Sequence, residues 1–129
     1  MYGNNEYSNY PYHRLNYEYG FRYLPIKIFN NVLSLGVAYA DELGLIRDRI
    51  SRITVLDSAA DKYAENNKGS FISYIKANPS GEVPFSDNCF DLITCSGTLH
   101  HIPNVSKFIK EIYRCTMREG YVLIREPIV

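Results

Sequence analysis

Two adjacent histidines, His100 and His101, are the side chains of this sequence best suited to acid–base chemistry. They follow an apolar run, Phe90–Cys95, which is broken by Ser96-Gly97. A run of this length bounded by turn residues is typical of a strand buried on both faces of a parallel sheet. Ligands of open α/β sheets bind at the carboxyl ends of the strands. Because imidazole titrates near neutral pH, either histidine could deprotonate a hydroxyl or amine; alternatively, one packs under the loop and hydrogen-bonds to the backbone.

A second group of residues has the spacing of a nucleotide-binding unit. Asn31–Gly36 predicts a strand, Val37–Ala40 a tight turn, and Asp41–Ile50 a helix with apolar residues at helical spacing. A turn built mostly from small residues lets backbone amides approach a ligand and lets the helix pack closely on the strand. By itself this turn is a weak signal.

A carboxylate follows the next strand. Arg52–Asp57 is a short apolar run whose last residue lies roughly 20 positions beyond Gly36, where a carboxylate can accept both ribose hydroxyls of a nucleotide. The alternative is that Asp57 caps a helix beginning near Ser58 and running to Asn67. Given the whole unit, the ribose role is favoured.

Three further elements complete an alternating pattern of strands and helices. Phe71–Lys76 predicts a third strand at the sheet edge, and Tyr121–Arg125 predicts a fifth strand. Between the fourth and fifth strands, Asn104 is a good N-cap for a helix over 105–117. The buried face of this helix is expected to consist of Val105, Phe108, Ile109, Ile112 and Cys115. Arg118 suits its last turn, and Gly120 is expected to stop it.

The stretch from Val83 to Pro103 closely resembles the fourth-strand region of class I S-adenosylmethionine (SAM)-dependent methyltransferases, in particular the type 11 group. The residues that carry the resemblance are Val83-Pro84-Phe85, Asp87, Phe90-Asp91 and Leu99-His100-His101. The first turn is similar to the first motif of the family, with departures. Gly36 matches its first glycine, Ala38 and Ala40 replace the second and third, and Ser34 stands where an acidic residue is common.

This resemblance implies an α/β, Rossmann-like three-layer sandwich with a mainly parallel sheet in the strand order 3-2-1-4-5. The usual C-terminal strands 6 and 7 of the family have no counterpart, so the domain is expected to be truncated. Residues 1–24, with seven of the 12 tyrosines, are expected to form a Tyr-rich arm with a short helix. Residues 25–129 are expected to form the SAM-binding domain, without metal.

The resemblance also implies a function and a site. The expected activity is transfer of a methyl group from SAM to an O or N of a small molecule, sugar or lipid-linked substrate, leaving S-adenosylhomocysteine. Asn78 replaces the polar residue that faces the adenine in the family, and Ser96 and Gly97 are expected near the methionine part. The expected cofactor-binding residues are Gly36, Val37, Ala38, Tyr39, Asp57, Ser58, Asn78, Ser96 and Gly97, and the expected catalytic residues are His100 and His101.

The amino-acid composition limits the kinds of partner that the chain is expected to bind. Lys plus Arg and Asp plus Glu both number 14, so electrostatic binding to nucleic acid is not expected. No apolar run could span a membrane, and no secretory leader is evident. The three cysteines share no CxxC spacing, which favours a reduced, cytoplasmic chain in which Cys95 acts as a small hydrophobic residue. The apolar fifth strand, as a sheet edge, or the Tyr-rich N-terminus could mediate a homodimer.

Two other functions stay open. The first is a non-catalytic, methyltransferase-like module that binds a partner or itself, favoured by the substituted glycines and the short C-terminal part. The second is a nicotinamide-dependent oxidoreductase, which the Gly36 turn and Asp57 alone would allow. The histidine stretch and the absence of a Tyr-x-x-x-Lys set count against the second.

Overall fold

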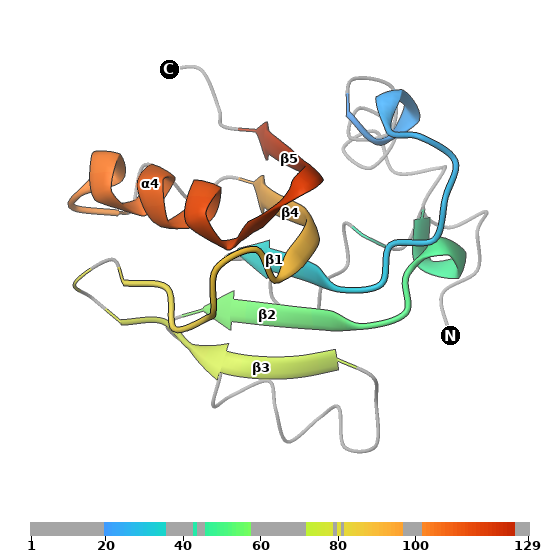
Figure 1. Ribbon diagram of the computed structural model, residues 1–129. Coiled ribbons are helices and arrows are strands. Elements are labelled where there is room, and N and C mark those ends of the chain that lie inside the picture. Colours follow the sequence, from blue (N-terminus) through green and yellow to red (C-terminus); the bar gives the residue numbers. More distant parts are fainter. Residues whose placement is uncertain are drawn as a thin grey trace.

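The computed structural model describes residues 20–35, 43, 46–57, 72–78, 80, 82–96 and 102–125. In this part of the chain a 3-10 helix is followed by four strands, a helix and a fifth strand (Figure 1). The elements are η1 (Phe21–Tyr23), β1 (Val32–Leu35), β2 (Ile53–Asp57), β3 (Ile72–Lys76), β4 (Phe90–Ser96), α4 (Val105–Cys115) and β5 (Thr116–Arg125).

The five strands form one parallel sheet in the order β3-β2-β1-β4-β5. This order confirms the sequence prediction, including the position of β3 at one edge. The central strand β1 pairs with β2 on one side and with β4 on the other, so that Leu35 lies opposite both Leu56 and Cys95. Parallel strands need crossover connections, and the only crossover helix among the described residues is α4, between β4 and β5.

Apolar side chains bury the sheet on both faces, as its short, continuously apolar strands predict. One core cluster joins the sheet to the segments before β1 and before β2. It contains Phe21, Leu24, Phe29, Val32, Leu43, Ile46, Ile50, Ile53, Val55 and Leu92. The other joins the sheet to α4 and to the loop before β4. It contains Leu33, Leu35, Leu56, Val83, Phe90, Ile93, Cys95, Phe108, Ile112 and Cys115.

The start of β1 is held by a buried carboxylate on the neighbouring strand. Asp91 accepts hydrogen bonds from the backbone N–H groups of Asn30 (2.7 Å) and Asn31 (3.0 Å). In turn, Asn31 accepts a hydrogen bond from the Asp91 backbone N–H at 3.1 Å. These three bonds order the end of the sheet at which β1 begins.

The segment between β1 and β2 differs from the predicted helix Asp41–Ile50. Residues 46–49 form a 3-10 turn, and Ile50 makes an isolated parallel bridge to Phe29. The bridge is continued by the Phe29 N–H, which donates to the Arg49 carbonyl at 2.7 Å. Leu43, Ile46 and Ile50 are nevertheless buried, so the apolar spacing correctly identified the inward side chains.

The predicted end and buried face of the helix after β4 are partly wrong. Asn104 does cap α4, because its side-chain oxygen accepts a hydrogen bond from the Lys107 N–H at 3.1 Å. The helix ends at Cys115 rather than at residue 117, and β5 begins at once with Thr116. Among the five residues of the expected buried face, Phe108, Ile112 and Cys115 are buried, whereas Val105 and Ile109 are 41% and 37% exposed.

The beginning of β5 is a bulge that the sequence did not predict. Thr116 pairs with Phe90, but the next regular pair joins Tyr121 to Leu92, so residues 117–120 form an excursion from the ladder. Arg118 and Gly120 therefore belong to the strand rather than to the last turn and the stop of the helix. A Cβ on Gly120 would lie 2.9 Å from Thr116 Cγ2 and 3.1 Å from the Phe90 carbonyl oxygen, so this close approach requires glycine.

Parts of the predicted organisation lie outside the described residues. The helix expected over Ser58–Asn67 and most of the N-terminal arm, residues 1–19, are among them. From that arm the structure describes residues 20–24, where η1 places Phe21 and Leu24 in the core. No described helix is long and apolar enough to cross a membrane.

Candidate cofactor site

The carboxyl ends of the strands define one edge of the sheet, and the predicted cofactor residues follow from that edge. Asp57 ends β2 and lies opposite Lys76, the last residue of β3. Ser96 ends β4 and lies opposite Arg125, the last residue of β5. Strand pairing therefore places a carboxylate, a serine and two basic residues along one edge.

The centre of this edge is a topological switch point. The chain leaves β1 at Leu35, between the ends of β2 and β4, and its next strand in sequence is β2 on one side. The following strands are β3, beyond β2, and then β4 on the other side of β1. Crossovers that depart in opposite directions leave a crevice outside the carboxyl ends of such strands, and ligands bind there.

Two buried hydroxyl groups lie next to the switch point. Ser34 on β1 and Thr94 on β4 are register partners, 0% and 1% exposed, and neither side-chain oxygen has a hydrogen-bond partner in the part of the chain that the structure describes. Buried hydroxyls normally have a partner, so two adjacent ones without partners mark a polar spot in an otherwise apolar sheet. This polar spot, together with Asp57, fits a site for a polar nucleotide cofactor.

The position of Asp57 agrees with a ribose-binding role. It is the last residue of β2, it is partly buried, and its backbone carbonyl accepts a hydrogen bond from the Ala77 N–H at 3.0 Å. That bond ties the end of β2 to the residue after β3. A carboxylate fixed at this strand tip can accept two hydrogen bonds from adjacent hydroxyl groups.

Asn78, the residue predicted to face the adenine, lies in the exposed loop after β3. Its side-chain oxygen accepts a hydrogen bond from the Ser80 N–H at 2.9 Å, which closes a local turn. An amide oxygen has two lone pairs, so this bond leaves one acceptor site on Asn78. The adenine contact stays a prediction.

Several predicted site residues lie outside the described part of the chain, although the strands that lead to them are described. Leu35 immediately precedes the predicted turn, and Ser96, whose backbone ends β4, precedes Gly97. Ile102, which packs against the core, follows the histidines. The predicted residues outside the described ranges are Gly36, Val37, Ala38, Tyr39, Ser58, Gly97, His100 and His101.

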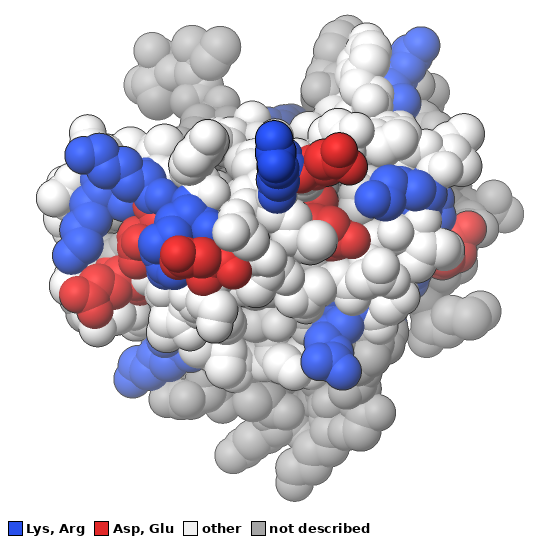
Figure 2. Space-filling view, viewed as in Figure 1, with Lys and Arg blue, Asp and Glu red and all other residues white. Residues whose placement is uncertain are grey.

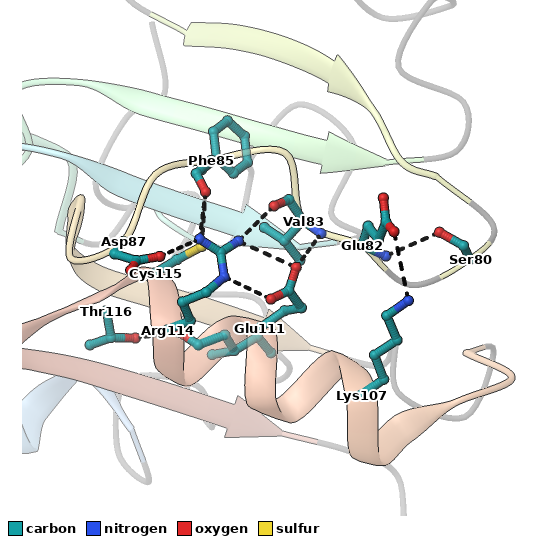
Figure 3. Close-up of polar contacts among 11 residues, drawn as sticks. Ser80, Glu82, Val83, Phe85, Asp87, Lys107, Glu111, Arg114, Cys115 and Thr116 are labelled. Atoms are coloured by element: carbon teal, nitrogen blue, oxygen red, sulfur yellow. Dashed lines mark hydrogen bonds and ion pairs between the residues drawn. The ribbon is translucent and has the colours of Figure 1, made fainter.

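The densest polar cluster that the structure describes lies near the amino ends of the strands, opposite the carboxyl ends that carry the candidate cofactor site. The Arg114 cluster consists of Arg114 and Glu111 on α4 with Val83, Phe85 and Asp87 in the loop before β4 (Figure 3). The guanidinium donates to the carbonyl oxygens of Val83 (2.9 Å) and Phe85 (2.8 Å) and to Asp87 Oδ1 (2.7 Å). It also donates to both carboxylate oxygens of Glu111, at 2.7 and 3.3 Å.

The charged side chains of the Arg114 cluster stabilise one another's ionised forms, as is typical of a structural ion pair. The hydrogen bond from Arg114 lowers the pKa of Glu111, and the bonds to Glu111 and Asp87 raise the pKa of Arg114. Figure 2 shows acidic and basic side chains mixed together on this side of the molecule. Because the cluster lies near the amino ends of β4 and β5, it is remote from the switch point and positions the loop before β4.

Sequence reasoning identified neither Thr94 as a polar member of the site nor the Arg114 cluster. Thr94 did carry a signal, since it is the one hydroxyl within the apolar core of the fourth strand. Arg114 had none, because two of its partners are backbone carbonyls. Among the described residues no group of three or more His, Cys, Asp or Glu side chains could hold a metal ion.

The sheet order and the switch point define a Rossmann-like fold of the kind found in class I SAM-dependent methyltransferases. Residues 33–124 match the methyltransferase domain family of type 11. The match covers more than half of the chain, and the chain belongs to this family. SAM is the methyl donor of the class.

One curated relative is similar to this chain in sequence. The ubiquinone/menaquinone biosynthesis C-methyltransferase UbiE of Rickettsia prowazekii is 38% identical over 60 residues, which are 46% of this chain and 24% of that protein. This chain thus spans about a quarter of the length of that relative.

Two solved structures share the fold. A SAM-dependent methyltransferase from Aquifex aeolicus has a TM-score of 0.71 at 18% identity, over 96% of this chain and 72% of that chain. The complex of the Haloferax volcanii Trm112 methyltransferase activator with a methyltransferase gives a TM-score of 0.72 at 17% identity, over 92% of this chain and 54% of that chain.

Proposed function

We propose that this chain binds SAM and transfers its methyl group to a small-molecule acceptor. The observation that carries the proposal is the switch point at the end of β1, flanked by Asp57 at the end of β2 and by Ser96 at the end of β4. Membership of the methyltransferase family supports the choice of SAM over a nicotinamide cofactor.

Each predicted residue has a role in holding the cofactor. The Asp57 carboxylate would accept hydrogen bonds from the ribose hydroxyls, and Asn78 would accept one from the adenine amino group. Backbone amides of the turn formed by Gly36, Val37, Ala38 and Tyr39, together with Ser58, Ser96 and Gly97, would line the rest of the site. The bound sulfonium supplies a methyl group that is already activated for in-line displacement.

The protein then has to orient the acceptor and remove a proton where the reaction requires it. His100 and His101 come after the carboxyl end of β4 in the sequence, and either imidazole could take that proton. General-base catalysis of this kind contributes roughly 100- to 10,000-fold to a rate. Either variant, His100→Ala or His101→Ala, should therefore lower kcat with little effect on cofactor affinity if that histidine is the base.

The acceptor atom is a finer part of the proposal. An O or N of a metabolite, sugar or lipid-linked substrate is the acceptor that the sequence predicts, whereas the relative from R. prowazekii is named for transfer to carbon. Incubation with SAM carrying a ¹³C-labelled methyl group would separate these, because the methyl carbon resonates at different frequencies on oxygen, nitrogen and carbon. Candidate acceptors should include quinone precursors as well as hydroxyl and amine metabolites.

Calorimetric titration with S-adenosylhomocysteine, with NADH as the control ligand, tests cofactor binding directly. Asp57→Ala should weaken binding about tenfold or more, since loss of a charged hydrogen-bond acceptor costs at least about 1.4 kcal/mol. Asp48→Ala is the matched control, because Asp48 is an exposed carboxylate in the turn before β2. Equal affinities of the parent and Asp57→Ala would refute the ribose assignment, and binding of NADH alone would refute the choice of cofactor.

A partner-binding module is the second candidate function, and the open edge of β5 favours it. β5 ends the sheet, and its residues Tyr121, Val122 and Ile124 are 39%, 37% and 45% exposed. An apolar edge strand with unpaired backbone groups can pair with another chain. We propose a homodimer formed through β5, with the Tyr-rich N-terminus as the other predicted contact. The Trm112 complex shows that a protein of this fold can also bind an activator.

Light scattering after size-exclusion chromatography tests this second function. The parent chain should have the mass of a dimer, and Val122→Lys should shift it towards the monomer because the edge of β5 would then carry a charge. Lys110→Glu, on the exposed part of α4, is the control that changes charge away from the edge. A monomeric parent would refute the dimer but not cofactor binding.

A cytoplasmic location accords with the proposed cofactor-binding function. Cys89, Cys95 and Cys115 are all free thiols in the structure, and disulfides are rare where the thiol pools are kept reduced. We therefore propose that the chain works in the cytoplasm. Fractionation of cells that express a tagged chain would test this, and recovery with membranes or outside the cell would refute it.

A further inference from the structure

We propose that Cys89 and Cys115 are a redox-active thiol pair, which a peroxide converts into an intramolecular disulfide without moving either of the elements that carry them. Cys89 immediately precedes β4, and Cys115 is the last residue of α4. The two cysteines are 26 residues apart in sequence, and the fold brings them together near the amino ends of β4 and β5, away from the switch point. Neither belongs to the proposed cofactor site.

Backbone geometry places the two residues within reach of a disulfide. The Cys89 N–H donates to the Cys115 carbonyl oxygen at 2.9 Å, and the neighbouring Asn88 N–H donates to the Arg114 carbonyl at the same distance. With standard bond lengths, the Cys89–Cys115 bond limits the Cα–Cα separation to at most about 6.8 Å. Native disulfides span Cα separations of about 4.4 to 6.8 Å, so this upper limit meets the distance that a disulfide requires.

The two side chains also lie in the same part of the core. Cys115 is fully buried, and its Sγ lies 3.8 Å from the Phe85 carbonyl oxygen, to which it can donate a weak hydrogen bond. Cys89 packs against the core cluster that contains Cys115 and is partly exposed. Burial raises the pKa of the Cys89 thiol, and the Cys115 side chain has a smaller, opposing effect on it.

The difference in exposure assigns the roles. Cys89, which solvent reaches, attacks the peroxide as a thiolate and becomes a sulfenic acid while one oxygen of the peroxide leaves as water. The Cys115 sulfur then attacks the Cys89 sulfur, and the sulfenic oxygen leaves as a second water. The two thiols lose two protons and two electrons in total, which is two hydrogen atoms, and one peroxide is reduced to two molecules of water.

Local charges modulate the rate. Burial raises the pKa of Cys89 and raises that of Cys115 to about 11, while the nearby positive charge of Arg114 opposes both shifts. Because the thiolate is the nucleophile, the rate of oxidation should rise about tenfold for each unit by which the pH is raised, as long as the pH stays below the pKa of Cys89. The pair would therefore remain reduced at neutral pH until an oxidant is in excess.

The third cysteine provides a matched control within the chain. Cys95 lies near the carboxyl end of β4, where it is fully buried and pairs in register with Leu35 and Ile124. It is therefore near the opposite end of the strand from Cys89. A disulfide between Cys95 and either of the other cysteines would require the sheet to open.

The test is oxidation of the folded 129-residue chain with hydrogen peroxide, followed by intact mass measurement and peptide mapping. The parent and Cys95→Ser should each lose two hydrogen atoms and yield one peptide that links residues 89 and 115. Cys89→Ser and Cys115→Ser should form no intramolecular disulfide. The oxidised parent should keep its circular dichroism spectrum and unfold at a Tm higher by several degrees, because the bond constrains the unfolded chain.

Three results would overturn the proposal. They are a linkage that involves Cys95, a loss of native circular dichroism on oxidation, or thiols that remain free in folded protein but oxidise after denaturation. If Cys115→Ser does not fold, peptide mapping of the parent and of Cys95→Ser still decides between these outcomes, since neither alters the pair. S-Adenosylhomocysteine affinity should be the same before and after oxidation, because the pair lies away from the switch point.

Discussion

Ser34 and Thr94 lie opposite one another on two neighbouring strands, and both hydroxyl groups are buried without a hydrogen-bond partner among the described residues. The cost of burying an unpartnered hydroxyl is about 1–3 kcal/mol. A fold that keeps two of them side by side next to a switch point retains polarity where a cofactor would bind. Both residues lie one position before the switch point, because the next pair along the same two strands joins Leu35, the last residue of β1, to Cys95 of β4.

Replacing Thr94 by valine should stabilise the chain. The Thr94→Val change keeps the shape of the side chain and removes the unpartnered hydroxyl, so the free energy of unfolding should rise by about 1 kcal/mol. Urea denaturation of the parent and variant measures this difference. Thr116→Val is the control, because the Thr116 hydroxyl donates to the Ile112 carbonyl at 2.7 Å and its loss should be destabilising. A less stable Thr94→Val would mean that the Thr94 hydroxyl has a partner in solution.

Among the described charged residues at the surface, Arg114 should be the one whose replacement lowers the free energy of unfolding most. Arg114→Ala removes hydrogen bonds to two backbone carbonyls and two carboxylates and should lower the free energy of unfolding by about 2 kcal/mol. Arg114→Lys should recover little of this loss, because a single ammonium cannot reproduce the planar fork of donors.

Lys107→Ala is the control for Arg114→Ala. Lys107 pairs with Glu82 at 3.8 Å, and the two side chains are 43% and 63% exposed, so the change should cost less than about 0.5 kcal/mol. Thermal unfolding of the three variants ranks them. Similar losses for Arg114→Ala and Lys107→Ala would show that the Arg114 cluster contributes no more than an ordinary surface ion pair.

The Glu111 carboxylate should make stability depend on pH in the acid range. Its hydrogen bonds from Arg114 and from the Val83 N–H lower its pKa below the ordinary value of 4.5 in the folded state. Ionised Glu111 therefore stabilises the fold fully above that value, and this stabilisation is lost as the pH falls through the lower, folded-state pKa. The free energy of unfolding measured from about pH 6 to pH 3 should fall less steeply for Glu111→Gln than for the parent. Parallel curves would contradict the assignment.

The sequence predicted most of the sheet because its strands carry their own signal. The bounds of the apolar runs Phe90–Cys95 and Arg52–Asp57 differ by no more than one residue from those of β4 and β2. The position of Asp57 at the end of a strand was therefore predicted correctly. The strand order came from the resemblance to the methyltransferase family. These features could be predicted because burial on both faces leaves little choice of side chain.

The parts that could not be predicted depend on contacts distant in sequence. Residues 116–120 have no strand pattern, and Thr116 is extended because it pairs with Phe90 rather than because of its neighbours. Val105 has the helical spacing of a buried residue but faces no described element, so it is exposed. The Arg114 cluster joins a helix to backbone carbonyls, which leave no trace in a sequence.

Gly120→Ala should destabilise the bulge at the start of β5, and the neighbour it meets suggests a second change that relieves part of the loss. The new Cβ would lie 2.9 Å from Thr116 Cγ2 and 3.1 Å from the carbonyl oxygens of Met117 and Phe90, a steric cost of about 1–3 kcal/mol. Thr116 cannot turn away freely, because its hydroxyl is bonded to the Ile112 carbonyl. Thr116→Ser removes Cγ2 and keeps that hydroxyl, so the double variant should be more stable than the sum of the single changes predicts when measured by a double-mutant cycle. Strict additivity would place the strain at the two carbonyl oxygens instead.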